Sequence, residues 1–155
     1  IVASPVVVDQ RIFVPSRVKP LLVLEAGGRA EGEAPEVVWS TTHGPDVPTP
    51  AIDGEHMYIL TDRGIMWCLK TETGDVVWGP ERVHSSTYRA SPVVAGGRVY
   101  VTNEAGLTTV VAAADEFEIL AENDIEEYTL SSIAVADGQI YLRTADHLYR
   151  IEATD

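Results

Sequence analysis

The feature that most constrains this chain is a motif that occurs four times along it. In each copy a Ser or Thr opens an apolar segment, and an aromatic residue lies nine positions later in a second apolar segment. The hydroxyl residues are Ser4, Thr49, Ser91 and Ser132, and the aromatic residues are Phe13, Tyr58, Tyr100 and Tyr141. Successive copies start 45, 42 and 41 residues apart, and a period in this range indicates a repeat architecture. We therefore divide the single domain 1–155 into repeats at 4–48, 49–90, 91–131 and 132–155.

A tight turn separates the two apolar segments of every copy. The turns are Asp9-Gln10, Gly54-Glu55, Gly96-Gly97 and Asp137-Gly138, which are residue types that tolerate the positive φ of a hairpin. Each copy is therefore predicted to open with two short antiparallel strands. Two further apolar segments follow in the first three repeats, at 20–24 and 36–39, at 64–69 and 75–78, and at 107–112 and 118–120.

Four strands in a repeat of this length match one blade of a β-propeller. Since no segment shows a sustained helical period with caps, we expect few helices. Each blade needs its neighbours to cover its faces, and Trp39 and Trp78, near the ends of fourth strands, are predicted to fill the space between blades. Leu120 takes the matching place in the third repeat. The sequence thus predicts an all-β propeller with four blades of about four antiparallel strands, half of a ring of about eight.

Such an array leaves an apolar face and an unpaired strand edge at each end. We expect another four blades to cover these ends, supplied by a second copy in a homodimer or by a missing half of the propeller. A closed ring of four is the alternative, although it needs tighter curvature than the large side chains of Trp39 and Trp78 favour. The start at Ile1, without an initiator Met, is typical of a processed product, a proteolytic fragment or an engineered piece.

One segment of the second repeat carries a family signature. Residues 67–78 read Trp-Cys-Leu-Lys-Thr-Glu-Thr-Gly-Asp-Val-Val-Trp, an apolar strand followed by a polar stretch, Thr-Gly, three residues and Trp. With the repeated Ser-Pro starts, this segment resembles the pyrroloquinoline-quinone-like (PQQ-like) repeat family. The resemblance covers essentially the whole chain, but only the second repeat has the complete signature. The first repeat lacks Thr-Gly, the third has Asp115 and Glu116 there, and the fourth stops at Asp155.

The resemblance implies a propeller that commonly closes with seven or eight blades. The family includes quinoprotein dehydrogenases and also non-catalytic proteins similar to the outer-membrane-assembly lipoprotein. It therefore implies a periplasmic, cell-envelope or secreted bacterial location, which the residues themselves do not indicate. An enzyme of this family would hold PQQ over a calcium ion, often beside a vicinal disulfide that the single Cys68 cannot form.

We find no residue pattern that indicates a catalytic, cofactor-binding or metal-binding site. One cysteine excludes an intrachain disulfide and a Cys-based zinc site. The histidines, two of which we expect at the surface near strand starts (His56 and His147), share no metal-binding spacing: His43, His56, His84 and His147. Trp67 could stack on a quinone, but a Trp inside an apolar strand usually packs in the core. The repeated Ser and Thr are predicted to serve strand geometry and a hydrogen bond in the ring interior.

Charge excludes further functions. A formal net charge of −13 argues against nucleic-acid binding, which depends on Lys and Arg, and against an anionic membrane surface. No apolar run approaches the roughly 18 residues of a membrane span, so we expect no membrane insertion. The acidic stretches 115–118 and 122–127 offer oxygen ligands for calcium but lack the spacing of an EF-hand. We interpret both as solvated loops.

Three functions remain open. The first is a non-enzymatic propeller module without a cofactor, which binds a protein or peptide on the ring face or along blade edges. The second is half of a PQQ-dependent quinoprotein dehydrogenase, whose PQQ and calcium sites lie in the missing half. The third is an excised or engineered fragment without a ligand of its own. Because the repeats come without catalytic residues, we favour the first, by analogy with the scaffold members of the family.

Overall fold

The computed structural model describes residues 3–16, 20–27 and 32–152, and within them it contains fifteen strands and no helix. The strands form four sheets. The first contains β1 (Val6–Val8), β2 (Arg11–Val14), β3 (Leu21–Glu25) and β4 (Val37–Thr41). The second contains β5 (Ala51–Asp53), β6 (His56–Leu60), β7 (Ile65–Lys70) and β8 (Val76–Arg82). The third contains β9 (Val93–Ala95), β10 (Arg98–Thr102), β11 (Leu107–Ala112) and β12 (Ile119–Asp124). The fourth contains β13 (Ala134–Ala136), β14 (Gln139–Arg143) and β15 (Leu148–Ile151).

Every sheet is an antiparallel meander in which neighbouring strands follow one another in the chain. The predicted hairpin turns all contain residues with φ between 51° and 73°, namely Asp9, Gly54, Gly96, Gly97, Asp137 and Gly138. This backbone region is open to glycine and accessible to Asp, which explains why these residue types recur in the turns. The two-strand opening of each repeat is therefore confirmed.

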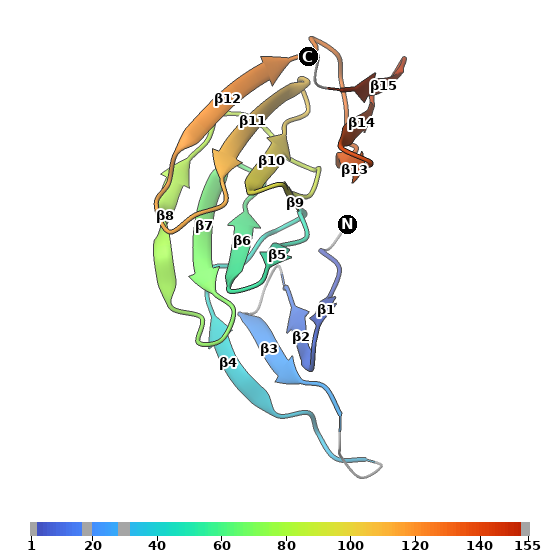
Figure 1. Cartoon of the computed structure of the whole chain (residues 1–155). Helices are drawn as coiled ribbons and strands as arrows, with labels where there is room; N and C mark the ends of the chain where they lie inside the picture. The colour runs from blue at the N-terminus through green and yellow to red at the C-terminus, as the bar shows by residue number, and fades with distance from the viewer. Residues whose placement is uncertain (1–2, 17–19, 28–31, 153–155) are drawn as a thin grey trace.

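The four sheets stand side by side along an open arc (Figure 1). Strands β1, β5, β9 and β13 lie on the concave side, and β4, β8 and β12 lie on the convex side. Strands that run outward from a central axis, one sheet after another, are the arrangement of propeller blades. The predicted all-β propeller is thus confirmed, and we name the sheets blades 1 to 4. The forward face of a blade is the face toward the next blade in the chain.

The motif aromatic takes the same place in every blade. Its first-strand partners are Val6, Ala51, Val93 and Ala134, which pair with Phe13, Tyr58, Tyr100 and Tyr141. Its third-strand partners are Val23, Cys68, Val110 and Arg150. Because the register is shared, any position in one blade can be compared directly with its counterpart in another.

The hydrophobic core lies between blades. One cluster joins blades 1 and 2 through Phe13, Leu21, Val23, Met57, Ile59 and Leu69. The other joins blades 2 and 3 and includes Tyr58, Leu60, Met66, Cys68, Trp78, Val99, Val101 and Val111. Successive residues of a strand point to opposite faces, so blade 2 contributes alternate residues to both clusters. Each blade is therefore stabilised by its neighbours.

Blades 3 and 4 depart from the prediction. The outer strand of blade 3 extends to Asp124, so residues 122–124 lie in a strand and not in the solvated loop that we predicted. All of β12 is nevertheless exposed. Blade 4 has three strands within the described residues, fewer than the other blades, and the end of its repeat, 153–155, lies outside them.

Candidate functional site

A chain of hydrogen bonds links the starts of the four blades. The backbone N–H of Ser4 donates to Thr49 Oγ1 at 3.0 Å, and the N–H of Thr49 donates to Ser91 Oγ at 2.9 Å. The N–H of Ser91 in turn donates to Ser132 Oγ at 2.8 Å. Each hydroxyl oxygen accepts from the preceding blade, so a Ser or Thr at this place joins two neighbours. We interpret these four residues as structural links.

Two tryptophans lie between blades at the outer part of the arc. Trp39 Nε1 donates to the carbonyl of Thr71 at 3.0 Å, and Trp78 Nε1 donates to the carbonyl of Ala114 at 3.0 Å. Both acceptors belong to the turn between the third and fourth strands of the following blade. Trp78 also packs edge-on against Phe117, with ring centroids 5.2 Å apart. An indole in this place buries apolar area and also satisfies its N–H.

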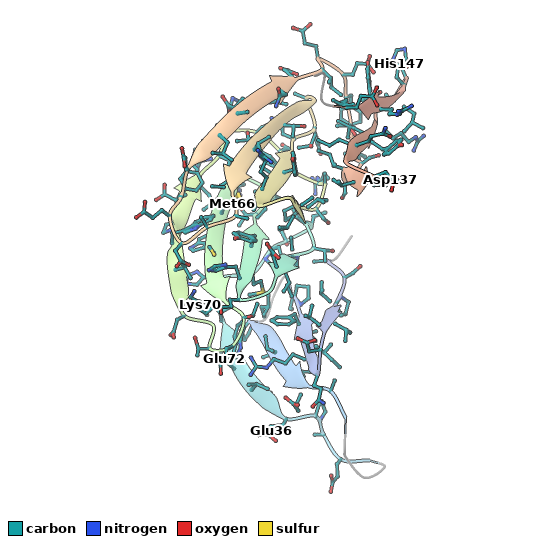
Figure 2. The ribbon with its side chains drawn as sticks, in the orientation of Figure 1. Glu36, Met66, Lys70, Glu72, Asp137 and His147 are labelled. Carbon is teal, nitrogen blue, oxygen red and sulfur yellow. The ribbon has the colours of Figure 1, made fainter. Side chains whose placement is uncertain are left out.

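A polar side chain reaches the same turn beside each tryptophan. Arg11 Nη1 donates to the carbonyls of Thr71 and Glu72, each at 2.9 Å. At the matching position of blade 2, His56 Nε2 lies 2.7 Å from Asp115 Oδ1. Figure 2 shows Glu72 at the edge of blade 2 that adjoins blade 1.

These contacts change the interpretation of one predicted surface group, His56, while Asp115 remains 69% exposed. Hydrogen bonds from His56 and Lys70 hold the pKa of Asp115 below its usual value. The side chain of His56 is only 18% exposed, so our prediction of a surface histidine there is wrong. Sequence reasoning missed this pair because its two members lie 59 residues apart, in different repeats.

The register corrects the prediction for blade 3. Trp39 pairs with Val23 and Trp78 with Cys68, and the residue that pairs with the equivalent Val110 is Ala121. Leu120 lies one position earlier, at the β-bulge, and is 44% exposed. The assignment of Leu120 as the counterpart of the tryptophans is therefore wrong. The sequence pointed to Leu120 because its side chain is more hydrophobic than that of Ala121. A β-bulge shifts by one residue which side chains lie on a given face of the strand, and no pattern in the sequence marks this bulge.

Glu127 joins blade 3 to blade 4 instead. Its carboxylate accepts hydrogen bonds from Thr144 Oγ1 at 2.6 Å and from Tyr149 Oη at 2.5 Å, and lies 2.9 Å from His147 Nδ1. The hydrogen bond from Thr144, followed by those from Tyr149 and His147, lowers the pKa of Glu127 to about 2. The hydrogen bond with Glu127 raises the pKa of His147. His147 lies at the end of the arc and is 62% exposed, as predicted (Figure 2).

The connection 125–133 between blades 3 and 4 presents two large side chains to solvent. Tyr128 is 55% exposed and Leu130 is 51% exposed. The residue between them is buried Thr129, whose N–H donates to Glu104 O at 3.1 Å and whose hydroxyl donates to Arg143 O at 2.7 Å. The N–H of Ala145 donates to Tyr128 O at 2.9 Å. A hollow of about 160 Å³ is lined by Tyr128, Thr129, Leu130, Ser131, Arg143, Thr144 and Ala145.

The described residues do not fit a quinone cofactor or its calcium ion. Trp67, our candidate platform, stacks on His43 with ring centroids 5.2 Å apart, and Gly79 approaches so closely that a Cβ there would lie 2.7 Å from its ring. In the part of the chain that the structure describes, no three His, Cys, Asp or Glu residues gather as a metal site. Burial raises the pKa of Cys68 to about 12, which keeps the thiol protonated and unreactive. Nor does any described segment form a helix that could cross a membrane.

The meander blades, their chain of hydroxyls and the tryptophans between them define a segment of a β-propeller. A family model described as "Outer membrane protein assembly factor BamB" matches residues 1–118. The chain belongs to this family, and the predicted resemblance to PQQ-like repeat propellers is confirmed. Outer membrane protein assembly factor BamB of Alkalilimnicola ehrlichii is 28% identical over 97 residues, which are 62% of this chain. The match spans only 25% of that relative's length.

Solved structures agree on the fold. BamB from Moraxella catarrhalis superposes with a TM-score of 0.72 at 16% identity, over 96% of this chain and 41% of that chain. Quinohemoprotein alcohol dehydrogenase ADHIIG from Pseudomonas putida HK5 superposes with a TM-score of 0.69 at 16% identity, over 90% of this chain and 28% of that chain. The computationally designed Ika8 protein superposes with a TM-score of 0.75 at 10% identity, over 96% of this chain and 45% of that chain. At these identities the similarity concerns the fold alone, and the partial coverage fits a half propeller.

Proposed function

We propose that this chain is a protein-binding propeller module without catalytic activity of its own. The observation that carries the proposal is the exposure of Tyr128 and Leu130 on a connection whose backbone is held from both sides by hydrogen bonds. Large side chains on a fixed backbone lose little conformational freedom when they are buried, and an aromatic of this kind often dominates the energy of a protein interface.

The surroundings of this pair also suit a protein partner. The hollow beside Tyr128 and Leu130 has room for a side chain and too little for a quinone. Polar residues line it, among them Ser131, Arg143 and Thr144, and Thr129 of the lining donates its N–H to the carbonyl of Glu104, whose side chain pairs with Arg89 at 3.1 Å. An apolar centre inside a polar rim is the usual anatomy of an interface between proteins.

We propose further that the partner belongs to the machinery that assembles outer membrane proteins, and that the module works in a bacterial cell envelope. The support is the name that the family and the relative from Alkalilimnicola ehrlichii share, outer membrane protein assembly factor. The whole arc would then be completed by four more blades. A second copy of the chain or another half of a longer propeller can supply them.

The exposed ends of the arc support such completion. Val7 of blade 1 is 63% exposed and Leu148 of blade 4 is 72% exposed. Ser4 and Ser132, which end the hydroxyl chain, are exposed as well, whereas Thr49 and Ser91 within it are half-buried. A homodimer would have twice the 16.8 kDa mass of the chain in light scattering.

Site-specific crosslinking in cells that make the full-length protein tests the binding surface. A photoreactive residue in place of Tyr128 or Leu130 should give a discrete crosslinked protein. The same residue in place of Glu116, which is exposed on the turn between β11 and β12, is the matched control and should give none. Equal crosslinking at all three positions, or none at 128 and 130, would contradict the proposal, as would turnover of alcohols by the purified protein with PQQ, calcium and an acceptor dye.

A further inference from the structure

The junction between blades 3 and 4 contains a cavity where the other two junctions contain an indole. Trp39 and Trp78 each pack on the motif aromatic of their own blade, with ring centroids 6.2 Å and 6.1 Å apart. In blade 3 the residue in the register of the tryptophans is Ala121. The motif aromatic of this blade, Tyr100, lines a cavity of about 180 Å³ instead.

A second difference between the blades enlarges the same space. The position of Met66, which is fully buried on the forward face of blade 2, belongs to Thr108 in blade 3. The residue paired with Thr108 is Thr102, which takes the place of Leu60. Each change puts a smaller side chain on the forward face of blade 3, and Thr108 lines the cavity. The cavity therefore arises from residues of a blade whose four strands are all present.

The three-stranded form of blade 4 does not explain the cavity. The fourth strand of a following blade lies outside the space between that blade and the preceding one. In the part of the chain that the structure describes, β8 contributes no residue to the core cluster of blades 1 and 2. Likewise, β12 contributes none to the cluster of blades 2 and 3. A fourth strand on blade 4 would therefore leave this space unfilled.

The cavity wall is mostly aliphatic and contains two polar side chains. The aliphatic residues are Val110, Ile125, Ile133, Ile140, Leu142 and Ile151. The polar residues are Thr108 and Asn123, and no charged side chain is among the described residues of the lining. Thr108 Oγ1 lies 2.9 Å from Thr102 Oγ1, and a hydroxyl with one such partner can still accept a hydrogen bond from another group. A wall of this composition favours a neutral, largely apolar ligand with one polar group.

We propose that this cavity binds a free, neutral aromatic molecule of about the size of indole, whose ring carries one hydrogen-bond donor. An apolar cavity of about 150 Å³ is large enough for benzene. The ring would lie beside Tyr100 in place of the missing indole, and its donor would bond to Thr108, as Trp39 and Trp78 donate to backbone carbonyls. This site goes beyond the proposed protein-binding function and does not depend on it.

Fluorine NMR of the purified chain with 5-fluoroindole tests the proposal, and 5-fluorobenzofuran, which has the same shape without the N–H, is the comparison. Both should bind saturably, and 5-fluoroindole should bind about fivefold more tightly. Thr108→Val should remove this preference without removing binding. Ala121→Trp should abolish binding of both molecules. Leu120→Trp, the same substitution at the exposed neighbouring position, is the matched control and should bind as the wild type does.

Two further probes define the kind of ligand. N-acetyltryptophanamide carries the same ring on a peptide backbone and should bind more weakly than indole by about tenfold or more, because the cavity has no room for the backbone. Indole-2-carboxylate should not bind, because the lining offers its charge no partner.

Circular dichroism establishes that each variant is folded. If Ala121→Trp is unfolded, Thr108→Met, which introduces the residue type of blade 2, is the blocking variant. Absence of binding to the wild type would overturn the proposal, as would binding that persists in a folded blocking variant or binding of N-acetyltryptophanamide as tight as that of indole. A preference for 5-fluoroindole that Thr108→Val leaves unchanged would overturn the role of Thr108.

Discussion

The junction between blades 2 and 3 and the junction between blades 3 and 4 are held together by different side chains. At the first, Trp78 packs against Tyr58 and Phe117 and donates its indole N–H to Ala114. At the second, Ala121 stands in the place of the tryptophan, and Glu127 accepts hydrogen bonds from blade 4. The two groups contact different turns of the following blade: Trp78 reaches the turn between its third and fourth strands, and Glu127 reaches the turn between its second and third strands.

What both junctions share is the link at the concave side. Thr49 donates its backbone N–H to Ser91 at one junction, and Ser91 donates its own to Ser132 at the other. The donor is a backbone group that every repeat has, and the acceptor is any side-chain hydroxyl at one position. This link therefore recurs at all three junctions of the described blades, whereas the tryptophan of the outer contact is absent between blades 3 and 4.

Trp78→Ala should have the largest effect on this comparison. The indole is 8% exposed and belongs to the core cluster of blades 2 and 3, so its removal leaves a cavity and removes the hydrogen bond to the carbonyl of Ala114. We expect a loss of about 3–5 kcal/mol in the free energy of unfolding, measured by urea denaturation. Val76→Ala, on the same strand but 46% exposed, should cost less than about 0.5 kcal/mol. Similar losses for both variants would show that the tryptophan does not join the blades.

Gly74→Ala should destabilise the junction of blades 1 and 2 by a smaller amount. A Cβ at Gly74 would lie 2.6 Å from the ring of Trp39, and φ there is +78°. Strain and displacement of the indole together should cost about 2–3 kcal/mol. Gly138→Ala has a similar φ of +73° with nothing within 4 Å, so it isolates the backbone strain and should cost about 1 kcal/mol. Equal thermal midpoints for the two variants would argue against close packing of Gly74 on Trp39.

Glu127→Gln should weaken the junction of blades 3 and 4 in a pH-dependent way. The folded pKa of Glu127, about 2, lies below its ordinary value of 4.5, so its contribution is complete above pH 4.5 and disappears as the pH falls toward 2. The pKa of His147 is raised above 6.5, so its contribution is complete below pH 6.5 and is lost as the pH rises through the folded value. The difference in stability between wild type and variant should therefore be largest between pH 4.5 and 6.5.

Thermal unfolding across pH 2 to 8 measures this difference. Asp124→Asn, which removes a neighbouring carboxylate that accepts from the Glu126 N–H of its own blade, is the control and should shift the midpoint less than Glu127→Gln between pH 4.5 and 6.5. A Glu127→Gln curve parallel to that of the wild type would mean that the carboxylate is not held by its three partners in solution.

The repeats could be predicted from the sequence because each of their signals is local. Turn residues at Asp9, Gly54, Gly96 and Asp137 lie inside hairpins, and the aromatic residue follows the hydroxyl at a constant distance. The contacts of Glu127 with Thr144, His147 and Tyr149 could not be predicted in this way. They span 17 to 22 residues, occur at one junction only and use residue types that ordinarily remain in solvent.

Ala121→Trp against Leu120→Trp is the smallest of these tests and the most discriminating for the register. Ala121 pairs with Val110 as Trp78 pairs with Cys68, so an indole at 121 would point toward blade 4, beside a cavity of about 180 Å³ lined by Val110, Ile140 and Ile151 among others. We expect Ala121→Trp to stabilise the chain by about 0.5–1 kcal/mol. Leu120 occupies the bulge, so Leu120→Trp should change the free energy of unfolding by no more than about 0.5 kcal/mol or reduce it. If the indole at 120 stabilised the chain and the one at 121 did not, the outer strand of blade 3 would be paired one residue away from where we place it, and Leu120 would be the counterpart of the tryptophans after all.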